Sequence, residues 1–460
     1  MKHGCVGEDK YIQESAKSTP VMAETEVLVV GSGPAGLAAA LAAAREGVKT
    51  MLVERYGCFG GAITHVGVNS IAWYRYEGTT DVEGIGIEFE RRAAEIGRNQ
   101  KSPFEQSDLI DTELFKYVAD LLVLEADIEP LLHCFAVDTI MEGRTIKGII
   151  TESKSGRQAI LAERVIDATG DADIAVLAGV PYSKTPKDEM LGVTVLFSCS
   201  GVKINRFLDY VREHPSTFAD WGENWDIKTT GKEDDLFSPY LEEPFNRARE
   251  DGLIPAELTS IGGTWSGLTD AGEATGLNMV YKFGYDGTDI RDLTRGEIDG
   301  RQQAMLAVEV LRRYVPGFEA ANLRNFGMTL GIRDSRKIIG RYALTEHDVL
   351  NQARFDDSIG IFPEFLDGYG VLVLPTTGRY FQVPYGILVP EEVENLLVAG
   401  RCVSGDKLSL ASLRSMMCCT VTGQGAGVAA AVSLKDGVNS GDVDINRVQK
   451  VLRKQGVRIS

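Results

Sequence analysis

The chain has 460 residues, of which 44% are hydrophobic and 25% are charged, as expected for a globular protein of about two or three domains. Its formal net charge of −18 disfavours a broad basic surface, so we expect no nucleic-acid partner. We find no apolar run of the roughly 18 residues that a membrane span needs, and no apolar secretory core at the N-terminus. We therefore expect a cytoplasmic protein that does not enter a membrane.

The seven cysteines form no CxxC pair, which argues against zinc, iron–sulfur or thioredoxin-type chemistry. We accordingly predict no metal site. Cys418 and Cys419 are adjacent and could form a redox pair, although such residues on a helix are more often small core side chains.

Residues 1–24 are polar and unpatterned, and we expect an N-terminal arm there. A dinucleotide-binding layout follows, in which a β-rich run enters a glycine turn, an alanine-rich helix and a second apolar run that ends at Glu54. Gly31 permits the tight turn, Gly33 lets the backbone approach a pyrophosphate, and Gly36 lets the helix pack closely on the strand. The helix N-terminus favours phosphates, and an acid at position 54 suits the ribose of FAD or NAD better than that of NADP.

The next segment is expected to complete the first part of this domain, residues 25–182. Apolar residues at helical spacing predict a helix over 108–126, and short alternating runs after it predict a three-stranded meander. The stretch RVIDATGDADIA, residues 164–175, then predicts a buried strand followed by a turn of small residues. The carboxyl end of such a strand is where open α/β sheets bind ligands.

Between residues 183 and 390 the dinucleotide pattern stops, and we expect an inserted domain of mixed sheet and helix. A helix is predicted to begin at Asp292, to be capped by Thr294 and Glu297, and to end before Pro316. Residues 391–460 are expected to return to the first domain with a short buried strand, a helix rich in glycine and alanine, and an amphipathic terminal helix. Three glycines inside the first of these helices cost about 1 kcal/mol each, which indicates close approach by a cofactor or by another helix.

Together these segments resemble the FAD-dependent oxidoreductase family allied to the fumarate-reductase and glutathione-reductase-like flavoproteins. The resemblance covers nearly the whole chain from about residue 20, and its marks stand in order: GSGPAG, ERYGCFGG, RVIDATGDADIA, FGYDGTDIRDLTRGEIDGRQQ, GIRDSRKIIGRYALTEHDVL, YFQVPYGILVP and AGRCVSGDKLSLASLRSMMCCTVTGQGAG. It implies an α/β protein with a discontinuous Rossmann-like FAD-binding domain, an inserted α+β substrate domain and non-covalently bound FAD.

The resemblance also implies where FAD lies. The glycine loop and the Gly-Gly pair after it should hold the pyrophosphate, the acid should bind the adenosine ribose, and a short helix start near residue 412 should direct N–H groups at flavin N1 and O2. Such N–H groups stabilise the negative charge of reduced flavin. In chain order the implied FAD residues are Gly31, Ser32, Gly33, Pro34, Ala35, Gly36, Glu54, Arg55, Gly60, Gly61, Ile63, Thr64, Ala136, Ala168, Thr169, Gly170, Asp171, Gly400, Arg401, Ser412 and Leu413.

One position departs from the family's pattern. We expect a histidine after the aspartate of the segment GRCVSGD, and this chain has Lys407 there. A base that titrates near neutral pH is thereby replaced by a cation, which puts histidine-based proton transfer at this position in doubt.

The residues that could bind substrate or move a proton are Arg414, Tyr380, Arg333, Lys407 and His65, with Tyr385 and Arg336 as further candidates. Arginines could bind a carboxylate or another oxyanion through paired hydrogen bonds, but structural ion pairs are an equally good explanation of Arg333 and Arg336. Core packing is the main alternative for the tyrosines. His65 follows the Gly-Gly pair, where packing, catalysis and covalent attachment of FAD all remain open.

The sequence contains a single GxGxxG, so we predict no built-in NAD(P)H site. Electrons would then pass to or from oxygen, a quinone or a partner protein. The first functional hypothesis is a two-electron hydride transfer between a small organic substrate and flavin N5. The alternatives are a flavoprotein subunit of a multi-component electron-transfer or dehydrogenase complex that is inactive alone, and an enzyme in which FAD has only a structural role. A homo-oligomer and a small partner subunit both stay open.

Overall fold

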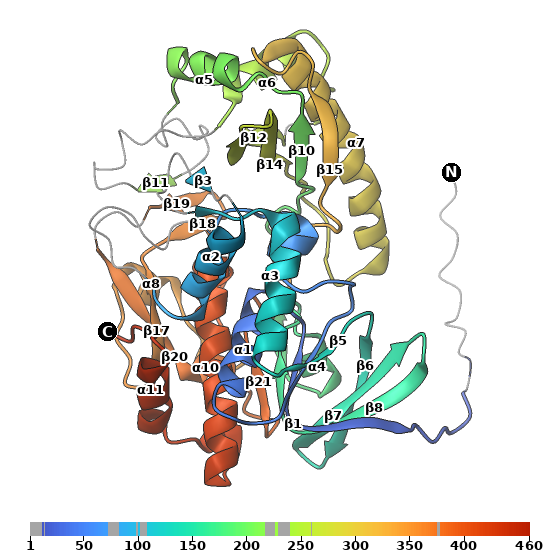
Figure 1. Cartoon of the computed structure of the whole chain (residues 1–460), viewed down its shortest axis with the longest axis vertical. Helices are drawn as coiled ribbons and strands as arrows, with labels where there is room; N and C mark the ends of the chain where they lie inside the picture. Colours follow the sequence, from blue (N-terminus) through green and yellow to red (C-terminus); the bar gives the residue numbers. More distant parts are fainter. Residues whose placement is uncertain are drawn as a thin grey trace.

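The computed structural model describes residue 12 and residues 14–71, 82–97, 100–101, 108–216, 226–228, 240–258, 260–374 and 378–460. Figure 1 shows two stacked parts, with one sheet in the lower part and another in the upper part. Most of the segment WGENWDIKTTGKEDD lies outside the described residues, and so does the beginning of the expected N-terminal arm. That arm is shorter than expected, because strand β1 already begins at Val21.

The lower part is built on a parallel sheet in the order β5-β2-β1-β8-β21. Its strands are β1 (Val21–Val30), β2 (Thr50–Val53), β5 (Glu129–Leu131), β8 (Gly156–Asp167) and β21 (Leu396–Val398). The strand order reverses between β1 and β8, and this is the edge at which doubly wound sheets bind ligands. The predicted Rossmann-like α/β fold is thereby confirmed.

The predicted meander is present beside this sheet. Strand β6 (Phe135–Glu142) pairs antiparallel with β7 (Thr145–Ser153), which pairs antiparallel with the first half of β8. Strand β8 therefore belongs to both structures, because its second half runs parallel to β1 and β21 and carries a buried apolar run into the sheet.

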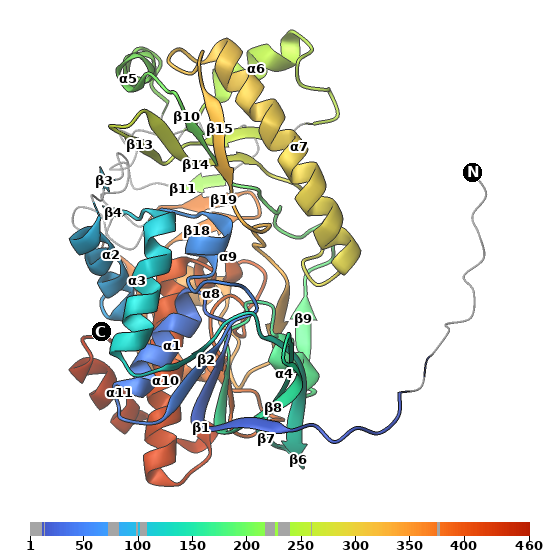
Figure 2. The same ribbon diagram turned by 45° about the vertical axis from the view of Figure 1, so that its right-hand side comes forward.

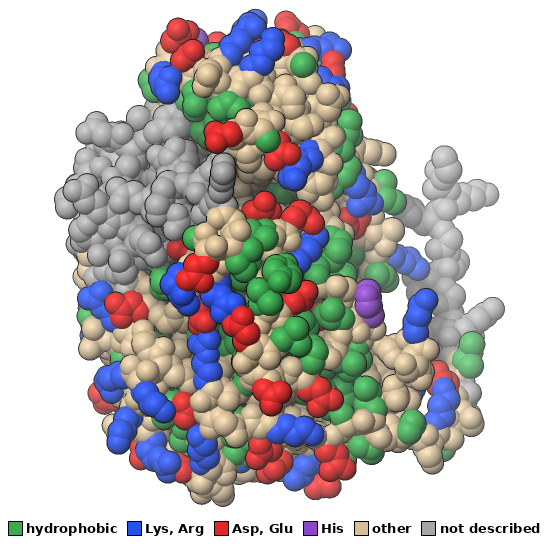
Figure 3. All heavy atoms as spheres, in the orientation of Figure 1, with side chains coloured by type: hydrophobic (Ala, Val, Ile, Leu, Met, Phe, Trp, Pro, Cys, Tyr) green, Lys and Arg blue, Asp and Glu red, His purple; other side chains and the backbone are tan. Residues whose placement is uncertain are grey.

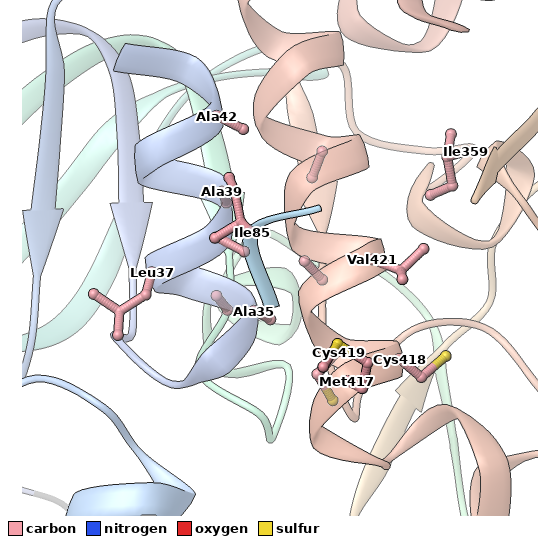
Figure 4. Close-up of a cluster of buried hydrophobic side chains, with 14 of the residues drawn as sticks. Ala35, Leu37, Ala39, Ala42, Ile85, Ile359, Met417, Cys418, Cys419 and Val421 are labelled. Atoms are coloured by element: carbon pink, nitrogen blue, oxygen red, sulfur yellow. The ribbon is translucent and has the colours of Figure 1, made fainter. Parts of the chain in front are cut away.

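Helices α1 (Pro34–Ala44) and α10 (Met416–Asp436) form the buried centre of the lower part, as Figure 4 shows. A Cβ on Gly423 would lie 2.0 Å from the carbonyl oxygen of Ala35, and one on Gly427 would lie 2.1 Å from that of Ala39. Two of the three predicted helix glycines thus let another helix approach. Gly425 faces the other way, toward Ile359 of strand β17.

Helix α10 is both the most apolar long helix of the described chain and the element that carries Cys418 and Cys419. We expected no apolar run long enough to span a membrane, but α10 is long enough and has a mean hydropathy of 1.3. However, 94% of its most apolar 18-residue stretch is buried inside the protein. It is therefore a core helix. Cys418 and Cys419 are both free thiols, and Figure 4 shows them on different sides of the helix. The two sulfurs pack as core side chains and form no disulfide.

The remaining helices of the lower part flank this centre. They are α2 (Ile85–Ile96), α3 (Thr112–Glu125), α4 (Asp173–Leu177), α8 (Glu346–Leu350), α9 (Leu410–Leu413) and α11 (Ile445–Lys454). The predicted helix over 108–126 begins only at Thr112, because Asp111 caps it by accepting hydrogen bonds from two backbone N–H groups. The terminal amphipathic helix is confirmed as α11.

The upper part, which we call the cap, has a core of its own that draws on residues from Val193 to Leu330. Its sheet has the order β12-β14-β10-β15, with β13 on β14, and α5, α6 and α7 accompany it (Figure 2). The bounds are β10 (Phe197–Ser200), α5 (Ile204–Glu213), α6 (Glu242–Glu250), β12 (Ile261–Thr264), β13 (Gly267–Thr269), β14 (Glu273–Val280), α7 (Ile290–Tyr314) and β15 (Asn322–Phe326).

The structure corrects two details of the predicted insertion. The buried apolar side chains of residues 344–374 and 378–389 belong to the lower core and not to the cap core, because strands β17 (Ser358–Pro363) and β20 (Tyr380–Pro384) are apolar and cover a side of α10. Helix α7 begins at Ile290 and is capped by Asp289, whose carboxylate accepts from two N–H groups, rather than by Thr294 and Glu297. The hydroxyl of Thr294 instead donates to Ile290 O within the helix, which ends before Pro316 as predicted.

Short strand pairs join the two parts. Strand β9 (Tyr182–Lys184) pairs with β16 (Arg336–Ile338), and β18 (Leu366–Gly368) forms a hairpin with β19 (Val371–Val373), which also pairs with β11 (Asp226–Lys228). A further pair consists of β3 (Gln100–Lys101) and β4 (Asp108–Leu109). One turn of π-helix, η1 (Ala62–Val66), follows the Gly-Gly pair, and the described residues also include the 3-10 turns η3 (Tyr385–Leu388) and η4 (Ser440–Asp442).

Candidate cofactor and active site

The turn between β1 and α1 is possible only with glycine at two positions. Gly31 has a φ of +94°, and a Cβ there would lie 2.5 Å from the carbonyl oxygen of Ala168 at the end of β8. A Cβ on Gly36 would lie 1.8 Å from the carbonyl oxygen of Gly31. The turn is therefore pressed between the end of β8 and the first turn of α1, at the edge where the strand order reverses.

The N-terminus of α1 has no side-chain cap within the described part of the chain. Gly33 is its N-cap, no side chain caps the helix, Pro34 is its first residue, and its first turn contains no acid. A Cβ on Gly33 would find one neighbour, the Cα of Gly61, at 3.9 Å. The first N–H groups of a helix have no acceptor within the helix, so this end of α1 can bind an anion.

The Gly-Gly pair crosses this loop closely. The N–H of Gly60 donates to Ser32 O at 2.9 Å, and a Cβ on Gly61 would lie 2.4 Å from the Cα of Gly33. The following π-helical turn contains the implied residues Ile63 and Thr64, both buried. These two predicted segments thus meet at the same place.

Glu54 lies at the end of β2 with a buried carboxylate. Its Oε2 accepts from the N–H of Ser32 at 2.9 Å and from the Ser32 hydroxyl at 2.6 Å, and its Oε1 accepts from the N–H of Tyr56 at 3.0 Å. The acid is thereby fixed beside the loop. Arg55 is exposed and lies over the ring of Tyr56.

The resemblance implies that the backbone of Ala136 contacts the adenine, but the backbone that bonds to Glu54 belongs to residues just before it. Cys134 N donates to Glu54 O at 3.0 Å, whereas Ala136 lies two residues further on, in β6 opposite Thr151. The backbone of Glu54 thus bonds to Leu131 and Cys134 and not to Ala136, and Cys134 carries no motif by which the sequence could have revealed it.

The end of β8 and the segment after β21 lie next to the glycine turn, at the same edge of the parallel sheet. Ala168 N donates to Val30 O at 2.8 Å, and Thr169 bonds back to Asp167. Arg401 donates to the carbonyl oxygen of Gly170 and to Asp171 at 2.9 and 2.6 Å, and also to Ile332 O. Its guanidinium is thus occupied by protein groups.

Gly400, just before Arg401, has a φ of +88° and donates its N–H to the Thr422 hydroxyl of α10 at 3.0 Å. This bond fixes the chain after β21 directly to α10. The turn needs glycine at this position because its backbone is left-handed.

The resemblance implied that Ser412 and Leu413 present free N–H groups to the flavin, but their N–H groups are used within the protein. Both donate to Ser409 O, at 3.0 and 2.9 Å, because α9 uses its own N–H groups in a tight turn. The open helix start lies a few residues later, at Met416 of α10, where Ser415 is the N-cap and makes no side-chain cap. The Ser412 hydroxyl is buried and has no hydrogen-bond partner within the described part of the chain.

These features fit an extended dinucleotide. Because Gly423 contacts Ala35, the start of α10 projects about two turns beyond the N-terminus of α1. Glu54, the open end of α1 and the open end of α10 therefore follow one another along the edge of the sheet. They match in turn a ribose, a pyrophosphate and an electron-rich ring system.

Two of the candidate catalytic residues, Arg333 and Arg414, lie at the boundary between the cap and the lower part, where each donates to a backbone oxygen. Arg333 donates to Gly192 O at 2.8 Å and to Asn278 Oδ1 at 3.2 Å. Arg414 ends α9 and donates to the backbone oxygen of Asp367 and, at 3.1 Å, to its carboxylate. Burial lowers the pKa of Arg333, and the nearby charge of Arg414 lowers it further.

His65 lies in η1 and is buried. Its ring packs edge-on against Tyr56 with centroids 4.6 Å apart, and its Nε2 bonds to Cys58 O at 2.8 Å. Since a carbonyl only accepts, the proton is assigned to Nε2, which leaves Nδ1 as an acceptor. Burial lowers the pKa of His65 despite the opposing effect of Glu54, so the imidazole is neutral at pH 7.

The remaining candidates have other partners. Lys407 forms a half-exposed ion pair with Glu189 at 2.8 Å, and Arg336 pairs with Asp173. The ring of Tyr380 lies 3.9 Å from the Arg354 guanidinium, and the buried hydroxyl of Tyr385 donates to Ser440 O at 2.6 Å. The contact of Tyr385 beside η4 agrees with the core-packing alternative, and none of these contacts links Tyr380 to Arg333 or Arg414.

Sequence reasoning missed polar residues that line the same boundary. Asn278 shares its Oδ1 between Arg333 and the Thr194 hydroxyl. The Oδ1 of Asn69 is buried and has no partner within the described ranges, and it faces Gly276 of β14. Tyr369 has a φ of +54°, an unusual conformation for a tyrosine, and its hydroxyl donates to Asp334 at 2.7 Å. The run DGYG around Tyr369 carried a turn signal, whereas the asparagines carried none.

The fold and the site define a dinucleotide-binding α/β flavoprotein. Residues 26–452 match the model of the FAD-dependent oxidoreductase family, and the chain belongs to that family. It is an enzyme and its cofactor is FAD.

Curated relatives match only part of the chain. The thiamine thiazole synthase of Methanococcus vannielii is 30% identical over 186 residues, which are 37% of this chain and 64% of that protein. The 6-methylpretetramide 4-monooxygenase of Streptomyces rimosus is 26% identical over 178 residues, 35% of this chain and 42% of that one. The match thus spans less than two thirds of either relative.

Solved structures resemble the chain over nearly its whole length at low identity. A geranylgeranyl bacteriochlorophyll reductase-like protein from Thermoplasma acidophilum has a TM-score of 0.48 and 12% identity, covering 94% of this chain and 82% of that one. The L-proline dehydrogenase from P. horikoshii has a TM-score of 0.43 and 11% identity, covering 95% and 99%.

Proposed function

We propose that this enzyme transfers a hydride between a small organic substrate and N5 of its FAD, at a C–C, C–O or C–N bond. The observation that carries the proposal is that Arg333 and Arg414 both lie at the boundary between the cap and the lower part, where each donates to a backbone oxygen. A cleft between two domains is a usual place for a ligand. FAD supplies the two-electron chemistry when bound, and the chain supplies position, charge and proton transfer.

In the oxidising direction a substrate C–H bond breaks and its electron pair leaves with the hydrogen as hydride. The proton of a neighbouring O–H or N–H must go to a base at the same time. His65 is the group we assign to that step, because its neutral imidazole keeps Nδ1 free to accept while Nε2 bonds to Cys58. The first N–H groups of α10, from Met416 on, would stabilise the negative charge that the cofactor gains.

The electron partner in this proposal is oxygen, a quinone or another protein, because the chain has a single GxGxxG. We place the enzyme in the cytoplasm and expect no nucleic-acid or membrane partner. In support, acidic and basic side chains are interspersed on the face in Figure 3 rather than gathered into one basic area. A homo-oligomer or a small partner subunit is compatible with this function.

The test is anaerobic mixing of the purified holoenzyme with a panel of alcohols, amines and, after photoreduction, enoates. The expected result is loss of the visible absorption of oxidised FAD with an alcohol or amine, or its return with an enoate. NADH and NADPH serve as controls and should leave the absorption unchanged. A panel that is inert until a stoichiometric co-purifying subunit is added would replace this proposal with the second one, a flavoprotein subunit that is inactive alone.

A further inference from the structure

We propose that Glu297 of the cap is a positioning residue for the FAD site, because it holds residues 327–331 against the π-helical turn η1 that carries His65. The inference rests on the function proposed above, in which His65 takes the proton. It adds a residue outside the FAD-binding part on which the geometry of that step depends.

The carboxylate of Glu297 bonds to a segment outside its own helix. Glu297 lies in α7, and its Oε1 accepts from the N–H of Leu330 at 2.6 Å and from the hydroxyl of Thr329 at 3.1 Å. Its Oε2 accepts from Arg301, one helical turn later, at 2.7 Å. A glutamate that only stabilised α7 would need no more than the pair with Arg301. The other oxygen therefore serves to hold the chain that follows β15.

The bond to Leu330 satisfies a backbone group that has little access to water. Leu330 is 4% exposed and belongs to the cap core. A buried N–H without an acceptor is costly, and a bond to a carboxylate is stronger than a bond to a neutral oxygen. Removing the carboxylate of Glu297 would therefore release residues 327–331 as well as weaken α7.

Residues 327–331 lie directly against η1. The N–H of Thr329 donates to the carbonyl oxygen of His65 at 3.0 Å. A Cβ on Gly327 would lie 2.2 Å from the carbonyl oxygen of Val66, and one on Gly331 would lie 2.8 Å from Cγ1 of the same valine. The close approach thus requires glycine at both ends of this segment. The segment and the last two residues of η1 therefore move as one unit.

The turn η1 is a feature that needs support from outside. It is a single turn of π-helix between Gly61 and Gly67, whose φ values are +53° and +89°. Turns of π-helix are rare and frequently occur at functional sites. This one contains Ile63 and Thr64, which belong to the implied FAD residues, as well as His65. The contact from the cap therefore fixes the turn on which these three side chains depend.

A second path joins the same segment to the acid at the end of β2. The hydroxyl of Tyr56 donates to the Thr329 hydroxyl at 3.4 Å, and the N–H of Tyr56 donates to Glu54 at 3.0 Å. The ring of Tyr56 also packs edge-on against His65. Thr329 therefore joins Glu297 of the cap to two residues of the FAD-binding part.

The experiment compares Glu297→Ala with Glu297→Gln in the holoenzyme. Alanine removes both bonds of Oε1, whereas the amide oxygen of glutamine can still accept from Thr329 and Leu330. The first measurement is hydrogen–deuterium exchange of the backbone amides of residues 62–68. The second measurement is the visible circular dichroism of bound FAD, which reports on the protein groups around the flavin.

We expect Glu297→Ala to raise the exchange rate of residues 62–68 by about tenfold or more and to change the circular dichroism of FAD, because a bond to a charged group is lost. Glu297→Gln should return the exchange rate to within about twofold of wild type and restore the circular dichroism. Glu309→Ala is the matched control, since Glu309 lies on the same helix and pairs with Arg312 and Arg313 of that helix. This control should leave both measurements unchanged.

Several results would overturn the assignment. They are an exchange rate of residues 62–68 within about twofold of wild type in folded Glu297→Ala, an unchanged circular dichroism of FAD, and a glutamine variant that behaves like the alanine variant. An equal rise in exchange in β10 and β14 would also overturn it, because it would show a role in cap stability alone. If Glu297→Ala does not fold, Thr329→Val replaces it and should raise the exchange rate by about threefold or more, and no rise would refute the inference.

Failure of this inference can be told apart from failure of the proposed function, because neither measurement needs a substrate. Loosening of η1 in Glu297→Ala, without any flavin reduction across the substrate panel in wild type, would remove the hydride-transfer function and keep the positioning residue. Flavin reduction at the wild-type rate in Glu297→Ala, with exchange of η1 unchanged, would keep the function and remove the positioning residue.

Discussion

The substitution Gly33→Ala separates cofactor binding from folding. Gly33 has a φ of −62° and a ψ of −177°, which any residue can adopt, and among the described residues outside its own helix turn a Cβ there would meet one atom, the Cα of Gly61, at 3.9 Å. The protein alone therefore accommodates the methyl group. Replacing glycine stabilises the folded protein because the unfolded chain loses freedom, whereas alanine destabilises it because it is a poorer N-cap. These effects oppose each other, so the free energy of unfolding of the apoprotein should change by less than about 1 kcal/mol.

The same methyl group would occupy the space through which a pyrophosphate approaches the start of α1. We expect the Kd of FAD to rise by at least about tenfold, equivalent to about 1.4 kcal/mol of binding free energy. The assay is titration of apoprotein with FAD, followed by the quenching of flavin fluorescence, together with thermal unfolding in the absence of FAD.

Gly423→Ala is the matched control, because its Cβ would lie 2.0 Å from the carbonyl oxygen of Ala35. This variant should lose about 1–3 kcal/mol of unfolding free energy through overpacking between α1 and α10. If folded Gly33→Ala binds FAD as tightly as wild type, the pyrophosphate does not pass over Gly33 and the assignment of this loop is refuted.

Three further predictions concern the same edge of the sheet. Glu54→Gln should weaken FAD binding by about tenfold in the same titration, because a charged acceptor becomes neutral, and an unchanged Kd would show that no ribose contacts it. Burial, aided by Asp171 and Asp167, raises the pKa of Asp173 from 3.8 to about 6, so ionising it as pH rises between these values costs the folded state stability. The Tm of Asp173→Asn relative to wild type should therefore increase from pH 4 to pH 7, and a constant difference would contradict this. Acid precipitation should release the yellow FAD into the supernatant, since we expect no covalent bond to His65, and colour in the pellet would show one.

The parts of the site that the sequence predicted are those in which the local backbone requires a particular residue. Gly31 and Gly36 are needed for the turn whatever the rest of the fold does, and an acid after β2 follows from its position at the end of that strand. The sequence misplaced the free helix start by a few residues, because only the structure shows that Ser412 N–H is used inside α9. It also could not show that Asp289, and not Thr294, caps α7.

By itself the sequence determined the class of fold and the cofactor, because a strand, glycine turn, helix and acid form within some thirty residues and leave little to long-range packing. Tertiary structure alone decided where the cap ends and which side chains face each other. Residues 344–374 and 378–389 contribute to the lower core because their apolar strands cover α10, and Arg333 bonds to Gly192 and Asn278 because the chain returns from the cap at that point. Contacts between residues so distant in sequence depend on how whole elements pack, and no local pattern encodes them.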